Sequence, residues 1–358
     1  LLNQTSVCFD TETTGIDALN AELVGISFSF EKGKGFYVPF PENQEEAQTL
    51  IEKFRPFFEN ENIEKIGQNM KYDLKILSNY NIQVKGKLFD TMIAHYLINP
   101  DMRHNMDVLS ETYLKYSPKS IETLIGKKGK NQLSMRDVPL EDIKEYATED
   151  ADITFQLKEH FQPILEKVGT KKLFDEIEIP LVPVLADMEK EGIRLDVEFL
   201  KSMSVDMQKE IDAFEQQIYE TAGEKFNLAS PKQLGEILFE KMKLDPKAKK
   251  TKTGQYATSE DVLQKLANKH EIIKHILEYR TYQKLKSTYV DALPSQIDKT
   301  DNRVHTNFSQ TTAATGRLAS VNPNLQNIPI RTLRGQQIRG AFVSGEGKKI
   351  ISADYSQI

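Results

Sequence analysis

Two acidic residues, one position apart, follow the first apolar run of the chain. Val7 and Phe9 indicate a strand that continues into Asp10 and Glu12. Because successive side chains of a strand alternate between its faces, we expect both carboxylates on the same face. Neighbouring like charges repel each other, and a divalent cation held by oxygen ligands relieves that repulsion. The alternative is a strand end whose acids simply point into water.

Two further carboxylates interrupt the apolar faces of predicted helices. Asp73 lies on the core-facing stripe of a helix expected over residues 70–80. Asp150 does the same in a helix expected over residues 141–165, with Tyr146 one turn before it. Burial of an unpaired carboxylate is costly. Each of these acids, taken alone, is also explained by a salt bridge to a nearby lysine or arginine.

Taken together, the four acids predict a shared site. Carboxylates on separate elements of one small α/β domain can bind two divalent ions roughly 4 Å apart, as phosphoryl-transfer sites do. An inward Tyr146 hydroxyl would then be placed to orient an attacking water. The acids in question are Asp10, Glu12, Asp73 and Asp150.

The order of the predicted elements indicates an α/β domain in the first half of the chain. Alternating strands over residues 1–40 precede the helices. Further elements are expected as a helix at 43–58, a strand at 63–66, and helices at 70–80, 90–98, 106–113 and 141–165. Strands followed by strand–helix alternation are typical of one α/β domain, which we expect to end near residue 172.

The second half differs in composition and is expected to be mainly helical. Helices are predicted over residues 177–191, 197–221, 258–269 and 271–289. Residues 241–252 hold six lysines and one acid, without apolar periodicity. Residues 303–358 mix short strands and loops, with an apolar strand expected over Lys349–Ala353.

Length and composition limit the class of protein. The 358 residues exceed one typical domain, and the formal charge of −6 argues neither for nor against nucleic-acid binding. Cys8 is the only cysteine, which excludes an intramolecular disulfide and a cysteine-based zinc site and suits a reducing cytoplasm. No apolar run is long enough to span a bilayer. The chain starts without a methionine and stops within an expected element, so we expect a piece of a longer protein.

Three motifs, in this order, resemble those of the DEDDy 3′–5′ exonucleases. They are Asp10-Thr-Glu12, Asn69-x-x-x-Asp73 and Tyr146-x-x-x-Asp150. The resemblance implies a ribonuclease H-like α/β domain with a mixed sheet and helices, which hydrolyses DNA from its 3′ end. It also implies that Asp10, Glu12 and Asp150 bind one ion, and that Asp10 helps to bind a second ion near Asp73.

The same resemblance implies the other parts of an exonuclease site. The two ions are Mg²⁺, for which Mn²⁺ or Zn²⁺ can substitute. Tyr146 positions the water nucleophile. Ile16 contacts the ribose, and Gln68 and Asn69 contact the terminal nucleotide.

Residues 178–358 resemble the thumb and the first part of the palm of family A DNA polymerases, the bacterial members being nearest. The stretches that carry this resemblance are PLVPVLADMEKEGI (180–193), FNLASPKQL (226–234), ILEYRTYQKLKSTY (276–289), TAATGRLAS (312–320), PNLQNIP (323–329) and SADYSQI (352–358). The implied domains are an exonuclease at 1–172, a mainly helical thumb at 173–300 and the truncated start of an α+β palm at 301–358.

Several polar residues of this half suit binding of duplex DNA. Lys249, Lys250 and Lys252 lie on a loop between helices, where mobile cations suit phosphates; the alternative is a solvated loop tip. The family's primer–template contacts fall on the positions of Arg280, Lys284, Arg317, Gln326 and Asn327. For the last two, turn formation beside Pro323 and Pro329 is the alternative.

Asp354 resembles the palm aspartate that binds both catalytic magnesium ions of a polymerase. The family also needs a second acidic motif and a nucleotide-gripping helix, both further downstream than residue 358. One aspartate cannot build that two-metal site. We therefore expect use of dNTPs and polymerisation only in the intact protein.

The leading hypothesis is a fragment of a DNA-directed DNA polymerase of replication and repair, with a proofreading 3′–5′ exonuclease. We expect a monomer at the nucleoid of the bacterial cytoplasm, bound to a single-stranded 3′ end or a primer–template duplex and to no membrane. The alternative is a catalytically inert DNA-binding module, which the presence of all four acids and the tyrosine argues against. A freestanding ribonuclease D-like RNA trimmer shares the nuclease motifs but leaves TGRL and SADYSQI unexplained.

Overall fold

The N-terminal strands form a mixed five-stranded sheet in the order β3-β2-β1-β4-β5. In the computed structural model, which describes residues 1–356, these strands are β1 (Ser6–Thr13), β2 (Leu23–Glu31), β3 (Lys34–Pro39), β4 (Glu64–Gly67) and β5 (Leu88–Asp90). Neighbours are antiparallel from β1 to β3, whereas β4 pairs in parallel with β1 and β5. Because β1 lies in the middle of the sheet, its acids lie among buried residues.

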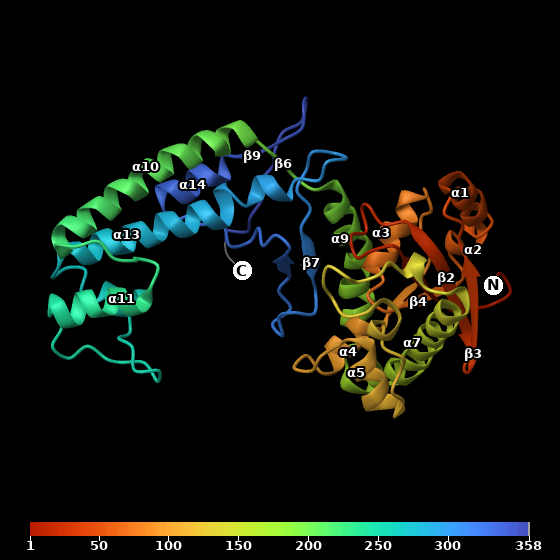
Figure 1. Cartoon of the computed structure of the whole chain (residues 1–358). Helices are drawn as coiled ribbons and strands as arrows, with labels where there is room; N and C mark the ends of the chain where they lie inside the picture. The colour runs from red at the N-terminus through yellow and green to blue at the C-terminus, as the bar shows by residue number, and fades with distance from the viewer. Residues whose placement is uncertain (357–358) are drawn as a thin grey trace. The chain divides into compact units, whose positions relative to one another are not determined.

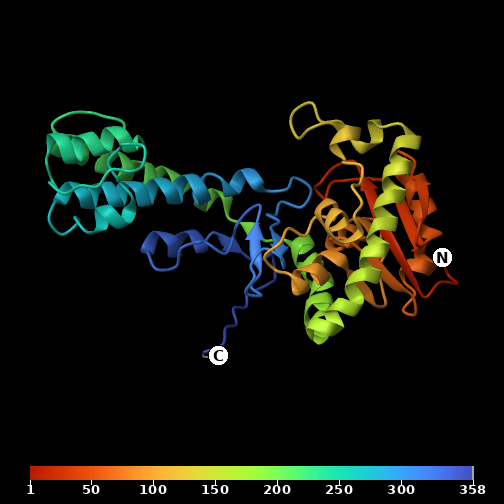
Figure 2. The same ribbon diagram turned by 90° about the horizontal axis from the view of Figure 1, so that it is seen from below.

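Helices cover both faces of this sheet. The long helix α7 (Leu140–Val168) crosses one face, as Figure 2 shows. It approaches so closely that a Cβ at Gly35 of β3 would lie 2.5 Å from Thr148 Cβ. On the other face, Phe58 of α2 (Arg55–Phe58) meets Phe9 of β1 edge-on, with ring centroids 5.2 Å apart. These apolar contacts join the sheet and its helices into one hydrophobic core.

The helix predicted over residues 43–58 is two helices, α1 (Gln44–Glu52) and α2. Asn43 caps the first of them, accepting hydrogen bonds from the N–H groups of Glu45 and Glu46. The break precedes Pro56, which has no N–H to donate to the carbonyl four residues earlier. The other helices that follow the sheet strands are α3 (Lys71–Asn79), α4 (Thr91–Ile98), α5 (Met106–Leu109), α6 (Glu122–Ile125), α8 (Lys171–Leu173) and α9 (Ile179–Glu191).

The chain divides into two compact units. The first comprises residues 1–192 and 306–324, and the second comprises residues 193–305 and those from 325 onward. The first unit thus includes a hairpin far along the sequence, made of β7 (Asn307–Ser309) and β8 (Ala319–Val321). The functional boundaries expected near residues 172 and 300 remain a prediction.

The second unit is mainly helical, as predicted. Its helices α10 (Val197–Ala222) and α13 (Glu271–Leu285) run side by side in Figure 1. Its other elements are α11 (Pro231–Gly235), α12 (Glu260–Gln264), α14 (Leu333–Arg339), and the paired strands β6 (Arg194–Leu195) and β9 (Phe342–Val343). None of the helices within residues 1–356 is long and apolar enough to cross a membrane.

The strand predicted over residues 349–353 was wrong. These residues and the following Asp354 are exposed and have no regular secondary structure. A strand needs a partner for its backbone N–H and C=O groups. In the described part of the chain, none of the strands pairs with this segment.

Candidate functional site

One pocket of about 830 Å³ collects the predicted catalytic residues. The residues from this set that line it are Asp10, Glu12, Asp73, Tyr146 and Asp150. Strand β1 supplies the first two, helix α3 supplies the third and helix α7 supplies the last two. The tertiary structure therefore brings together acids from three separate segments, around a space of the size that small-ligand sites have.

Thr11 holds the carboxylate of Asp73. Its N–H donates to Asp73 Oδ1 at 3.1 Å, and its hydroxyl donates to the same oxygen at 2.5 Å. Strand alternation puts the Thr11 side chain on the opposite face of β1 from Asp10 and Glu12. Sequence reasoning did not select Thr11, because alternation alone places it away from the acids.

Burial raises the pKa of all four carboxyl groups. It raises the pKa of Asp10 to about 6, although this side chain opens partly to the pocket. Burial is also the largest cause of the raised pKa values of Glu12, Asp73 and Asp150, and the charge of Asp10 adds to each. Ionisation of this group of acids is therefore unfavourable here, and a cation between them would reverse that effect.

Two buried carboxylate oxygens at this pocket, Glu12 Oε1 and Asp150 Oδ1, have no hydrogen-bond partner within residues 1–356. Leaving a buried polar atom unpaired costs about 1–3 kcal/mol, and oxygen ligands are those that Mg²⁺ prefers. Over the same residues, no three Asp, Glu, His or Cys side chains already converge as metal ligands. Bare carboxylates repel one another, which opposes their convergence unless a cation or a proton lies between them. By donor type and burial, the residues fit a divalent cation.

Tyr146 keeps its proton at neutral pH. Burial raises the pKa of its hydroxyl well above the usual value, and the nearby charge of Asp150 adds to the shift. In the metal-free pocket the phenol is therefore protonated and does not act as a base. It can still orient a water molecule by hydrogen bonding.

The three predicted nucleotide contacts line the same pocket: Ile16, Gln68 and Asn69. The Ile16 side chain is 89% exposed, so a large apolar surface is available there. Gln68 donates to the carbonyl of His104 at 2.7 Å and accepts from the hydroxyl of Thr91. Lys128 also lines the pocket, and it belongs to the lysine–glycine loop at residues 126–130. The basic, glycine-containing composition of this loop is the sequence signal that could have assigned Lys128 to the site.

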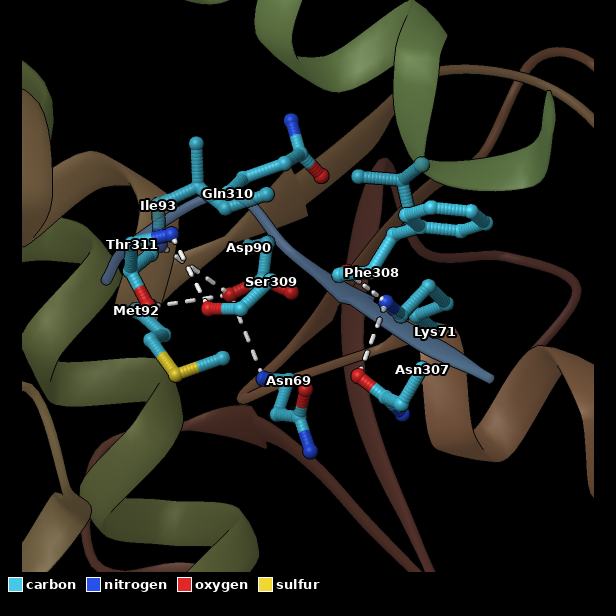
Figure 3. A pocket seen from close by; sticks show the side chains of 11 residues that line it. Asn69, Lys71, Asp90, Met92, Ile93, Asn307, Phe308, Ser309, Gln310 and Thr311 are labelled. Carbon is cyan, nitrogen blue, oxygen red and sulfur yellow. Dashed lines mark hydrogen bonds between the residues drawn. The ribbon is translucent and has the colours of Figure 1, made fainter. Parts of the chain in front are cut away.

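Asp90 fixes the backbone beside this pocket, and sequence reasoning did not select it. Figure 3 shows its carboxylate bound to the N–H of Asn69, at 3.2 Å, and near the start of α4. It also accepts hydrogen bonds from the N–H groups of Met70 at 2.8 Å, Met92 at 2.9 Å and Ile93 at 3.3 Å. The available signal was an aspartate directly before an apolar helix, the position of an N-cap.

The predicted duplex contacts on the long loop of the second unit are exposed. They are Lys249, Lys250 and Lys252. The ammonium of Lys250 lies 4.5 Å from the centroid of the Tyr256 ring. Arg280, on α13, donates to the carbonyl of Thr258 and lines a hollow of about 460 Å³ together with residues of this loop. The structure thus brings Arg280 to the base of the lysine loop.

The remaining predicted DNA contacts are distributed over both units. Lys284, Gln326 and Asn327 are exposed in the second unit, where the Asn327 carbonyl accepts the hydroxyl of Tyr289 at 2.7 Å. Arg317 is exposed in the first unit, on the loop between β7 and β8. Asp354 is exposed in the second unit and is not part of the carboxylate pocket.

Comparisons with known proteins assign both halves of the chain. Residues 1–166 match the 3′-5′ exonuclease family, and residues 197–358 match DNA polymerase family A. DNA polymerase I of Pseudomonas aeruginosa is 43% identical over 363 residues, which cover 98% of this chain and 40% of that protein. For DNA polymerase I of Bacillus subtilis, the identity is 40% over 98% of this chain and 39% of that protein. The chain therefore spans about 40% of the length of these relatives.

A solved structure agrees with this assignment. The POL domain of Pol1 from M. smegmatis, in complex with DNA primer-template and dNTP, matches with a TM-score of 0.82 and 30% identity. The match covers 96% of this chain and 56% of that one. The chain thus carries a domain of the 3′-5′ exonuclease family at residues 1–166, followed by part of a DNA polymerase family A domain at residues 197–358.

Proposed function

We propose that this chain hydrolyses DNA from its 3′ end, as the proofreading exonuclease of a DNA polymerase. Water attacks the terminal phosphodiester, the bond to the 3′ oxygen breaks, and a nucleoside monophosphate leaves. The observation that carries this proposal is the shared pocket of four acids, three of them buried, and one tyrosine, with two carboxylate oxygens unpaired within residues 1–356.

The acids would hold two divalent ions. Asp10, Glu12 and Asp150 would bind one, and Asp10 with Asp73 would take part in binding the second. We propose Mg²⁺, with Mn²⁺ or Zn²⁺ as substitutes. When bound, such a pair of ions activates the water nucleophile and stabilises charge on the phosphate and the leaving oxygen.

The protein's own side chains would orient the reactants. The hydroxyl of Tyr146 would orient the attacking water by hydrogen bonding. Ile16 offers an apolar surface to the terminal sugar, while Gln68 and Asn69 contact the terminal nucleotide. Thr11 keeps the Asp73 carboxylate in a fixed orientation. Neutral side chains would therefore position the reactants, while the charged side chains would bind the metal ions.

A single-stranded DNA labelled at its 5′ end tests this function. With Mg²⁺ or Mn²⁺, we expect products that shorten progressively from the 3′ end. Asp73→Ala should abolish shortening while the circular dichroism spectrum stays unchanged. Asp142→Ala, at an exposed position of α7, is the matched control and should retain activity. If the unsubstituted chain leaves the DNA intact, the catalytically inert DNA-binding module becomes the better account.

The second half supports binding of a primer–template duplex. Exposed cations on a loop suit phosphates, and the M. smegmatis relative was solved with DNA of this kind. The residues that we assign to this role are Lys249, Lys250, Lys252, Arg280, Lys284, Arg317, Gln326 and Asn327. Residues 173–300 would act as the thumb, and residues 301–358 as the start of the palm.

Template-directed synthesis would belong to a longer protein that contains this chain. There, Asp354 would help to bind the metal ions that serve an incoming dNTP. We propose that the protein acts as a monomer. The bacterial origin of the relatives and the DNA substrate support action at the nucleoid, in the cytoplasm.

A further inference from the structure

The β7–β8 hairpin lies within the polymerase-type part of the sequence, yet it packs within the first unit. The carboxylate of Glu189 on α9 accepts a hydrogen bond from the Phe308 N–H at 2.6 Å. The ammonium of Lys71 on α3 donates to the Phe308 carbonyl and lies beside Asn307, as Figure 3 shows. Both backbone groups of one β7 residue are therefore held by the Lys71–Glu189 ion pair of the first unit.

The next contact along the hairpin is also buried. Gln310 donates to the carbonyl of Glu178 at 2.9 Å and to its carboxylate at 2.7 Å. Both side chains are nearly inaccessible, at 8% and 9% exposure. The first strand of the hairpin and the residue after it are thus held by hydrogen bonds at Phe308 and at Gln310. The chain then continues toward the TGRL motif.

Tyr96 of α4 binds the turn that precedes Arg317. Its hydroxyl donates to the carbonyl of Ala313 at 2.8 Å and accepts from the N–H of Gly316 at 3.2 Å. Gly316 has a φ of +75°, a conformation that glycine adopts without strain. A backbone hydrogen bond from the Gly316 N–H to the Ala313 carbonyl at 3.2 Å closes this turn. The buried Tyr96 hydroxyl binds both of its ends, and the next residue is the exposed Arg317.

We propose that Tyr96 is a positioning residue for Arg317, so that a side chain of the exonuclease domain orders a DNA contact of the polymerase part. The inference rests on the proposed duplex contact of Arg317. The tyrosine hydroxyl binds the backbone on both sides of the turn, which sets the direction in which the chain leaves Gly316. Arg317 then starts from a fixed backbone, and less conformational entropy is lost when it binds DNA.

Loss of the Tyr96 hydroxyl should weaken duplex binding and leave hydrolysis of single strands unchanged. Tyr96 does not line the carboxylate pocket, so Tyr96→Phe removes no group that we assign to the exonuclease reaction. We expect the dissociation constant for a primer–template to rise about three- to tenfold, the range for loss of one or two net hydrogen bonds. The rate of shortening of a single strand should stay within about twofold of the unsubstituted rate.

Tyr80→Phe is the matched control. Tyr80 is equally buried, and its hydroxyl likewise accepts one hydrogen bond, from Leu23 N–H, and donates another, to Gln44 Oε1. These partners lie away from the hairpin, in β2 and α1. Any general effect of removing a buried tyrosine hydroxyl should appear in both variants, whereas the loss of duplex affinity should appear only in Tyr96→Phe.

A double-mutant cycle tests whether Tyr96 acts through Arg317. Binding of a labelled primer–template to the full chain is measured by fluorescence anisotropy at one fixed salt concentration. Arg317→Ala should weaken binding, and adding Tyr96→Phe to it should weaken binding no further. Equal effects of Tyr96→Phe with and without Arg317 would overturn the inference. If Arg317→Ala alone leaves affinity unchanged, the proposed duplex contact fails, and the inference falls with it. If both single variants act and the cycle is non-additive, Tyr96 acts through Arg317.

Discussion

The hydroxyl of Thr11 and the carboxylate of Asp73 lie 2.5 Å apart, although 62 residues separate them in the sequence. The Thr11 N–H reaches the same carboxylate oxygen at 3.1 Å. Strand β1 thus carries two of the pocket acids, Asp10 and Glu12, and also orients a third that comes from α3. The geometry of the acids depends on a neutral residue between two of them.

Thr11→Val should therefore slow the exonuclease without changing substrate affinity. Valine keeps the shape of threonine and the backbone N–H but lacks the hydroxyl that binds Asp73. We expect kcat to fall about tenfold, equivalent to one hydrogen bond to a charged group, with KM nearly constant. Thr11→Ser, which retains a hydroxyl, should recover most of the rate in steady-state assays. Equal rates for the valine variant and the unsubstituted chain would show that this bond does not matter.

Metal ions should change the stability of the fold through the pocket acids. Without metal, Asp150→Asn removes a buried carboxyl group whose ionisation is unfavourable beside Asp10, so the free energy of unfolding should rise by about 1–3 kcal/mol. In the unsubstituted chain, Mg²⁺ at 100 times its dissociation constant should add about 2.7 kcal/mol, and the asparagine variant should lose most of this gain. Urea denaturation with EDTA or Mg²⁺ measures both. The exposed control Asp142→Asn should respond to Mg²⁺ as the unsubstituted chain does.

The buried charges at Glu189 should contribute strongly to stability. Glu189 is 2% exposed and pairs with Lys71 at 2.5 Å and Lys75 at 2.6 Å. Glu189→Gln leaves two poorly solvated ammonium groups without their counter-charge, so we expect a loss of about 3–5 kcal/mol in the free energy of unfolding. Asp206→Asn, which breaks an exposed pair with Lys209, should cost less than about 0.5 kcal/mol. Similar losses for the two variants would contradict the argument.

Acidification should destabilise the fold through His95. Burial lowers the pKa of this fully buried histidine to about 4 from an ordinary value of 6.5, and the neighbouring His104 adds to the shift. Above pH 6.5 the imidazole is neutral in both the folded and the unfolded chain and has no effect. As the pH falls from 6.5 toward 4, only the unfolded chain takes up the proton, so stability falls by about 2–3 kcal/mol.

The measurement for His95 is a comparison of pH profiles, because the pocket acids titrate over part of the same range. Thermal unfolding of the unsubstituted chain and of His95→Gln should be followed from pH 7.5 to 4.5. The difference between the two profiles isolates the histidine, and it should shift in favour of the variant as the pH falls. Parallel profiles would show that His95 does not take part in acid destabilisation.

The identity of the pocket acids follows from local sequence. Alternation in β1 places Asp10 and Glu12 together, and helical spacing places Asp73 and Asp150 on inward faces. These patterns depend on residues close in sequence, so they can be read without a fold. The helix cap at Asn43 is another such feature, since its hydrogen bonds reach only two and three residues ahead.

Only the tertiary structure decided which distant groups meet those acids and how the hairpin is held. Thr11 reaches Asp73, Asp90 binds the backbone before α3, and Tyr96 binds the turn before Arg317. Each is a hydrogen bond between residues brought together by packing, and no local periodicity encodes it. The failed strand at residues 349–353 has the same physical reason, because a strand forms only where a partner supplies the other half of its hydrogen bonds.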